Sequence, residues 1–95
     1  MKVKRISWSY EKNAKLKRER GIGFEDALLQ INGSEVLDIV HHPNKRKYPN
    51  QRVFILEINE YVYYVPFVED ENEVFLKTII PSRKLKKEYL GGKNK

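Results

Sequence analysis

The sequence predicts an α+β domain: two N-terminal helices, a four-stranded, mainly antiparallel sheet, and one C-terminal helix. Apolar residues recur at helical spacing between residues 24 and 32, whereas after residue 35 they alternate or run together as in strands. Short turns separate the strands expected between residues 51 and 80, which is typical of an antiparallel meander. With helices before and after such a sheet, we expect the helices to cover one of its faces.

Two helices are expected before the sheet. Ser9 can cap a helix over residues 10–20, Glu11 falls in its favourable first turn, and Gly21 can end it. This helix is strongly cationic and has little apolar surface, so we expect it to pack through a narrow stripe. Gly23 is a weaker cap for a second helix over residues 24–32. The side chains of this second helix expected to face the core are Phe24, Ala27, Leu28 and Ile31.

The strands are expected over residues 36–40, 51–58, 61–68 and 73–80. Asn59 and Glu60 can form a two-residue turn, because Asn tolerates a positive φ. Pro66 lacks a backbone N–H, which predicts a bulge or an unpaired edge near the end of the third strand. A polar loop over residues 41–50 and a last helix over residues 83–90 complete a single domain over residues 1–95, with residues 91–95 as a frayed tail.

Composition narrows the class of partner. Nineteen Lys and Arg residues against thirteen Asp and Glu residues leave a net charge of +6, which fits a polyanion such as nucleic acid. The chain has no cysteine, so disulfides and thiolate metal sites are excluded and a reducing, cytoplasmic location is expected. No apolar run resembles a secretory signal or approaches the roughly 20 residues of a membrane span, so no membrane association is expected.

The start of the last helix is the most informative feature for function. Arg83 and Lys84 fall in its first turn, where the unpaired N–H groups already carry partial positive charge. Each cation costs roughly 0.3–1 kcal/mol at that position on a surface. The arrangement is reasonable if an anion binds there, and RNA phosphate is the candidate.

The motifs of metal-dependent hydrolysis are absent. The chain has no Gly-rich phosphate loop and no HExxH motif, and its two histidines are adjacent, so on a strand they would point to opposite faces. We therefore expect neither a metal nor another cofactor. RNA cleavage needs no metal if the ribose 2′-hydroxyl attacks the neighbouring phosphate. The protein then supplies a base, a proton donor for the leaving 5′ oxygen, and cations for the phosphorane.

The candidate residues are cations and proton carriers. Arg83 is proposed as the phosphate clamp. The full set of catalytic candidates is Arg83, Lys84, Arg52, Lys77, His41, His42 and Tyr48. The RNA-binding candidates are Lys12, Lys15, Arg20, Lys45, Arg46, Lys47 and Trp8. A block of lysines is more often simply a solvated face. Trp8 is more often a hydrophobic anchor than a platform for stacking a base.

Three stretches resemble BrnT-type toxins of type II toxin–antitoxin systems, in the RelE/ParE-like superfamily. They are residues 8–13 (WSYEKN), 20–27 (RGIGFEDA) and 80–84 (IPSRK), and the resemblance spans roughly residues 6–90. Trp8 matches the leading Trp of that family, and Arg83 and Lys84 match its terminal basic pair. Arg20 stands where the family usually has His, and Gly23 stands where a Ser cap is common.

The resemblance implies a RelE-like fold and a ribonuclease activity that blocks translation. It also implies neutralisation by a DNA-binding antitoxin encoded alongside, in a toxin–antitoxin hetero-oligomer. The leading hypothesis is therefore a toxin acting as a metal-independent endoribonuclease on mRNA. A second hypothesis is a non-catalytic module that uses the same basic surface to hold RNA, DNA or an acidic partner. A third is an interaction protein whose sheet edge pairs with a strand of its partner.

Overall fold

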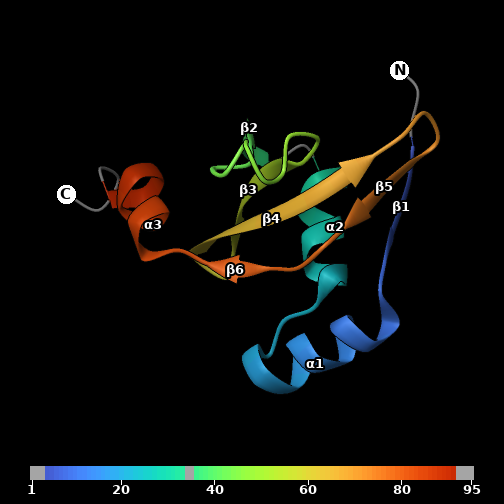
Figure 1. Ribbon diagram of the computed structural model, residues 1–95. Helices are drawn as coiled ribbons and strands as arrows, with labels where there is room; N and C mark the ends of the chain where they lie inside the picture. The colour runs from blue at the N-terminus through green and yellow to red at the C-terminus, as the bar shows by residue number, and fades with distance from the viewer. Residues whose placement is uncertain (1–3, 34–35, 92–95) are drawn as a thin grey trace.

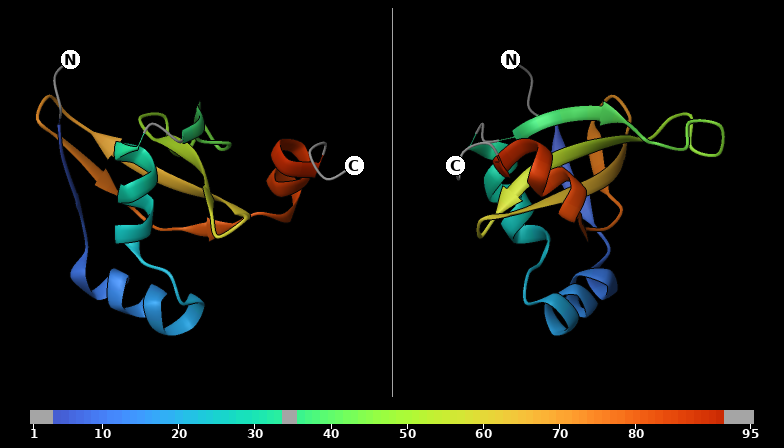
Figure 2. Two further views of the ribbon diagram at one scale, coloured as in Figure 1. Left: turned by 180° about the vertical axis from the view of Figure 1, so that it is seen from behind. Right: turned by 90° about the vertical axis from the view of Figure 1, so that its left-hand side faces the viewer.

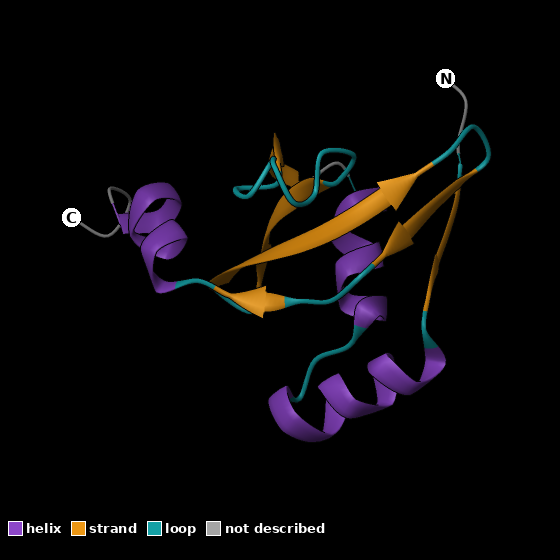
Figure 3. Ribbon diagram, in the orientation of Figure 1, coloured by secondary structure: helices purple, strands orange, loops and turns teal. Residues whose placement is uncertain are grey.

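The computed structural model describes residues 4–33 and 36–91, and within these ranges the chain forms three helices and six strands (Figures 1 and 3). In chain order they are β1 Arg5–Trp8, α1 Tyr10–Arg20, α2 Phe24–Asn32, β2 Val36–His41, β3 Arg52–Ile58, β4 Tyr61–Glu69, β5 Glu73–Leu76, β6 Ile80–Pro81 and α3 Arg83–Leu90. The predicted α+β class is confirmed, and all three helices begin and end where the sequence predicts. The expected tail lies mostly outside the described residues.

The sheet is mixed, with the strand order β1-β5-β4-β3-β2, and β6 pairs with β4 (Figure 1). The β1–β5 pair is parallel, and the other pairs are antiparallel. The prediction of four strands is wrong in two places. The N-terminal segment forms β1, which is too short to show a period in the sequence. The strand expected over residues 73–80 is divided into β5 and β6.

Pro66 explains where that division falls. Its carbonyl oxygen accepts a hydrogen bond from the backbone N–H of Lys77 at 2.8 Å. In an antiparallel ladder the N–H and C=O of one residue point to the same neighbouring strand. Pro66 has no N–H, so the segment that follows β5 lacks a hydrogen-bond donor at this position. The neighbouring segment leaves the ladder after Leu76 and rejoins it at Ile80. The ladder between β3 and β4 runs past Pro66 without interruption, so the break lies in the neighbouring strand rather than in β4.

Both faces of the central strands are apolar, and each is covered by different helices. Phe54 and Leu56 of β3 face a core that includes Phe24 of α2. The alternate residues Val53 and Ile55 face a second cluster, which includes residues of α3. The expectation that all helices cover one face is therefore wrong. A single helical layer would leave the other apolar face of β3 and β4 in water, and α3 covers part of it (Figure 2).

The predicted caps and turns form as expected. The Oγ atom of Ser9 accepts a hydrogen bond from the backbone N–H of Lys12 at 3.2 Å, and Gly21 ends α1 with a φ of 75°. Asn59 and Glu60 join β3 to β4 with φ values of 54° and 66°. Two successive positive φ values match the right-handed twist of a tight hairpin, so the turn fixes the register of the two longest strands.

The junction between α1 and α2 is held by contacts of Trp8, Asn13 and Asp26. Trp8 stacks on Phe24 with ring centroids 5.5 Å apart. Asn13 is 5% exposed, and its Oδ1 atom accepts a hydrogen bond from the backbone N–H of Phe24 at 2.7 Å. A Cβ atom on Gly23 would lie 2.7 Å from this Oδ1 atom, so any other residue there would push the side chain of Asn13 away. The carboxylate of Asp26 accepts a hydrogen bond from the N–H of Gly23 in place of a side-chain cap.

Candidate nucleic-acid interface

The first turn of α3 presents its two cations to different hollows. The Oγ atom of Ser82 caps the helix by accepting a hydrogen bond from the backbone N–H of Leu85 at 3.1 Å. Arg83 and Lys84 follow, and both are exposed. Lys84 lines a pocket between α3 and the sheet, whereas Arg83 lines a separate hollow beside Lys86. The predicted pair is therefore not one clamp, and Lys84 is the member that faces the sheet.

We call the hollow beside Lys84 the α3 pocket, and its volume is about 280 Å³. Its lining residues are Val40, Pro43, Val53, Ile55, Tyr64, Ser82, Lys84, Leu85 and Glu88. The floor consists of apolar side chains from three neighbouring strands, β2, β3 and β4. Lys84 and Glu88 are four residues apart on α3, so they lie one turn apart on the same side of the helix. The pocket thus combines an apolar floor with one cation and one carboxylate.

Contacts from its last turns hold α3 over the sheet. Leu90 is buried against a cluster that includes Val53 and Ile55. The hydroxyl of Tyr89 donates a hydrogen bond to the Oδ2 atom of Asp38 at 3.0 Å. Partial burial, together with this bond to a carboxylate, raises the pKa of Tyr89 above its ordinary value. The helix is therefore fastened to β2 and β3, which fixes the wall of the pocket.

The loop after β2 extends from the edge of the pocket at Pro43. The rings of His42 and Tyr48 lie 4.4 Å apart, and the Nζ atom of Lys47 lies 5.4 Å from the ring centre of Tyr48. The Nδ1 atom of His42 accepts a hydrogen bond from the backbone N–H of Asn44 at 3.0 Å. In the neutral imidazole the proton is therefore on Nε2. His42 can donate a hydrogen bond from that atom, and in this form it cannot act there as a base.

The structure does not bring Arg52 or His41 to the α3 pocket. His41 pairs with Arg52 across β2 and β3, one residue from the pair of Val40 with Val53 that lines the pocket. Successive strand residues point to opposite faces, so His41 and Arg52 point away from it. The guanidinium of Arg52 also forms an ion pair with Glu69 at 2.8 Å. Arg52 therefore contributes to the fold on the other face.

Glu69 joins two cations from distant parts of the chain. Its carboxylate binds Lys4 at 3.0 Å as well as Arg52. Partial burial acts to raise the pKa of Glu69, but the hydrogen bonds and charges of Lys4 and Arg52 outweigh it, so the pKa is lowered. This arrangement ties the N-terminal segment to β3 and β4, and it neutralises cations that the sequence left available for RNA.

The remaining candidates are spread over the surface. Lys77 lies where the chain leaves β5, with its Nζ atom 5.7 Å from the ring centre of Phe75. Trp8 is partly buried against Phe24, which agrees with an anchor rather than a stacking platform. Lys12 on α1 is half-buried. The exposed candidates on α1 and in the loop are Lys15, Arg20, Lys45, Arg46 and Lys47. Those on α1 lie well away from α3 (Figures 1 and 2).

Sequence reasoning missed three polar or aromatic residues of the pocket, Ser82, Glu88 and Tyr64. A signal for Glu88 was present, because it follows Lys84 by four residues in a predicted helix. Tyr64 gave no comparable signal. Its strand is apolar or aromatic at almost every position, so the sequence could not show which face α3 would leave partly open.

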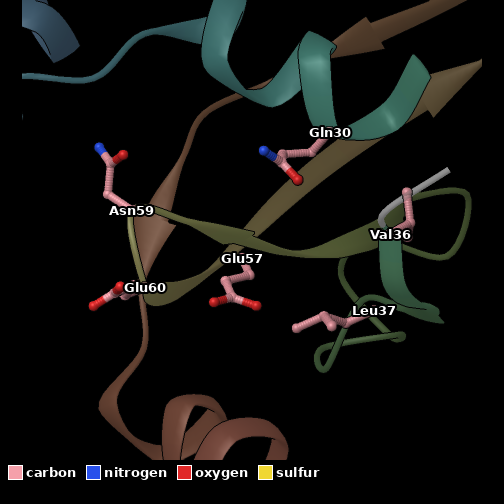
Figure 4. Close-up of a pocket in the computed structure, with 6 residues that line it drawn as sticks. All are labelled: Gln30, Val36, Leu37, Glu57, Asn59 and Glu60. Atoms are coloured by element: carbon pink, nitrogen blue, oxygen red, sulfur yellow. The ribbon is translucent and has the colours of Figure 1, made fainter. Parts of the chain in front are cut away.

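A second hollow, of about 470 Å³, lies near the turn between β3 and β4. Figure 4 labels its lining residues, which are Gln30, Val36, Leu37, Glu57, Asn59 and Glu60. The side chains of Leu37 and Glu57 reach into the same space from neighbouring strands. Two carboxylates at its wall would repel a polyphosphate, so this hollow is a poor site for RNA despite its size.

Residues 4–33 and 36–91 contain neither a candidate metal site nor a helix that could span a membrane. No cluster of three or more His, Asp or Glu side chains in these ranges could hold a metal ion. None of the helices in them has the length and apolar character needed to cross a membrane.

No family model, no curated protein and no solved structure matches this chain. The likeness to BrnT-type toxins therefore remains an expectation from the sequence. In the structure, the N-terminal residues that carry this likeness pack α1 and α2 together. Trp8 stacks on Phe24, while Asn13 hydrogen-bonds to Phe24 and to the carboxylate of Glu25. These residues therefore join α1 to α2, and their contacts do not indicate a catalytic reaction.

Proposed function

We propose that the protein is a toxin of a type II toxin–antitoxin pair that cleaves mRNA without a metal ion and so blocks translation. The observation that carries the proposal is that Lys84 and Glu88 line one pocket on a protein with a net charge of +6. The pocket also borders, through Pro43, the loop that holds His42. A cation for the phosphorane and a carboxylate that can act as a base are two of the groups that 2′-hydroxyl attack on phosphate requires.

Each group has a distinct role in the proposed reaction. The carboxylate of Glu88 takes the proton of the 2′-hydroxyl, whose oxygen then bonds to phosphorus. The bond from phosphorus to the 5′ oxygen breaks, and the proton that Glu88 took passes through water to that oxygen. The products are a 2′,3′-cyclic phosphate and a free 5′-hydroxyl. The ammonium group of Lys84 stabilises the negative charge of the phosphorane between these steps.

The toxin assignment is supported by the three stretches that resemble BrnT-type proteins and by the α+β architecture, in which two helices precede the antiparallel strands. A RelE-like fold and a DNA-binding antitoxin, encoded next to the toxin and bound to it, belong to the same proposal. Growth arrest on expression, reversed by co-expression of the adjacent small gene, is the expected result. Unimpaired growth at high expression would contradict the toxin assignment.

The cleavage test uses purified protein and single-stranded RNA in EDTA. We expect cleavage by the wild type, and a loss of about 100-fold or more for Glu88→Gln, because a general base typically contributes 10²–10⁴-fold. Lys84→Gln should also be slow. Lys87→Gln is a matched control, because it removes the same charge from α3 but does not line the α3 pocket. Intact RNA at high protein concentration would contradict the nuclease.

A non-catalytic RNA-binding module is the second candidate, and the placement of two predicted catalytic residues favours it. Arg52 and His41 lie on the face opposite the pocket, and Arg52 is paired with Glu69. Such a module would bind RNA in a salt-sensitive way without cutting it. Normal affinity of Glu88→Gln for RNA, with no cleavage by the wild type, would support the module over the nuclease.

A further inference from the structure

We propose that the apolar floor of the α3 pocket binds one unpaired nucleobase of single-stranded RNA, while Lys84 contacts an adjacent phosphate. The inference rests on the proposed function, because it assigns a substrate subsite within the same pocket. It adds that the protein acts on unpaired RNA and holds a base next to the reacting phosphate.

The size and lining of the pocket suit a flat ring. Its volume of about 280 Å³ lies just below the roughly 300–1,000 Å³ of sites that enclose drug-sized ligands. Val40 and Val53 are direct cross-strand partners, and Ile55 is paired with Tyr64 on the next strand. These four side chains form a continuous apolar floor with one aromatic ring. Base–aromatic contact of this kind is worth about 1–3 kcal/mol per base.

The rim has the polar groups that a nucleotide requires. Lys84 can bind the phosphate that precedes or follows a seated base. The hydroxyl of Ser82, whose oxygen caps α3, also lines the pocket and can donate a hydrogen bond to an oxygen of the base. A base inside a duplex is stacked and paired, so it cannot enter the pocket. The pocket therefore selects RNA in which at least one base is unpaired.

Charge favours RNA over an apolar side chain of a protein partner as the occupant. The loop that begins at Pro43 carries three exposed cations in a row, Lys45, Arg46 and Lys47. Glu88 is the only acidic residue in the pocket lining, against this run of cations and Lys84. A strand of phosphates can pass along the loop while one base enters the pocket.

The test measures binding of a 2′-O-methyl RNA hexamer, which lacks the attacking hydroxyl and cannot be cleaved by the proposed reaction. We compare it with a hexamer of the same backbone in which the bases are absent. Loss of the bases should weaken binding at least about fivefold, the factor that corresponds to 1 kcal/mol. Methyl NMR signals of Val40, Ile55 and Leu85 should shift with the intact hexamer only.

A pair of variants on one strand supplies the matched control. Val40 and Ile39 are 37% and 44% exposed, so both can be replaced without opening the core. They point to opposite faces of β2. Val40→Glu should weaken binding of the intact hexamer at least about fivefold. Ile39→Glu adds the same charge on the other face and should leave that affinity within about twofold.

Three results would overturn the inference. Equal affinity for both hexamers would show that only phosphates are bound. Equal losses for the two variants would show a general charge effect. Methyl shifts that appear with a partner protein but not with the hexamer would assign the pocket to an apolar side chain. If any of these results were found but RNA was still cleaved in EDTA, the base pocket would be wrong and the proposed nuclease activity would be retained. If binding depended on the bases but RNA was not cleaved, the base pocket would be retained and the proposed nuclease activity would be wrong.

Discussion

Asn13 shows how a single polar side chain can determine the position of a helix. Among residues 4–33 and 36–91 it is the one buried polar residue. Its Oδ1 atom accepts a hydrogen bond from the N–H of Phe24, and its Nδ2 group donates one to Glu25. In α1 only Asn13 and Leu16 are buried, so the helix has little apolar contact of its own. The position of α1 therefore depends strongly on these two hydrogen bonds.

Asn13→Ala should lower the free energy of unfolding by about 1–3 kcal/mol, because it leaves the buried N–H of Phe24 without an acceptor. The measurement is urea unfolding followed by circular dichroism. Lys15→Ala is the control, since Lys15 is exposed on the same helix, and its effect should stay within about 0.5 kcal/mol. Similar small effects for both variants would mean that α1 does not depend on the Asn13 bonds.

The elements differ in how far the sequence determines them. The three helices were predictable because capping residues and apolar spacing are local signals. The extra strand β1 was not, since its four residues form a strand only through parallel pairing with β5, about 68 residues away. The division of the strand expected over residues 73–80 into β5 and β6 was also not predictable from the sequence. Its cause is Pro66 on the neighbouring strand, and the sequence showed that proline without showing which neighbour would lose the hydrogen bond.

The β3–β4 hairpin offers a test at this scale, because Glu60 adopts a φ of 66°. A left-handed backbone costs an L-residue other than Gly about 1–2 kcal/mol, and part of this is offset by the extra freedom of Gly in the unfolded chain. Glu60→Gly should therefore stabilise the protein by about 0.5–1 kcal/mol in thermal or urea unfolding.

Glu60→Ala separates backbone from charge. It removes the same carboxylate but keeps a Cβ atom at the positive φ, so it should give little or no gain. If alanine stabilised the protein as much as glycine, repulsion between Glu60 and the nearby Glu57 would be the cause, and the backbone explanation would be wrong.

At the scale of the whole molecule, the two faces of the sheet have separate tasks. The face that packs α2 holds the Trp8–Phe24 stack and the ion pairs of Glu69. The opposite face holds α3 and its pocket. The sequence predicted Lys84 as a site residue from its helix position, and in the structure Lys84 lines the α3 pocket. The sequence could not show that Arg52 and Lys84 lie on different faces, since this depends on where α3 packs.

This division predicts that equal changes of charge have unequal effects on RNA binding. For single strands, each phosphate contact contributes about 0.7 to the slope of log K against log salt. Lys84→Gln should therefore reduce that slope by up to about 0.7 for a short single-stranded RNA that the protein cannot cleave. Lys15→Gln removes the same charge from α1, which lies well away from α3 (Figure 2), and should change the slope little. Fluorescence anisotropy between about 50 and 200 mM salt gives both slopes. Equal reductions from the two variants would mean that RNA binds to the overall positive charge of the protein, and that the α3 pocket has no special part in holding it.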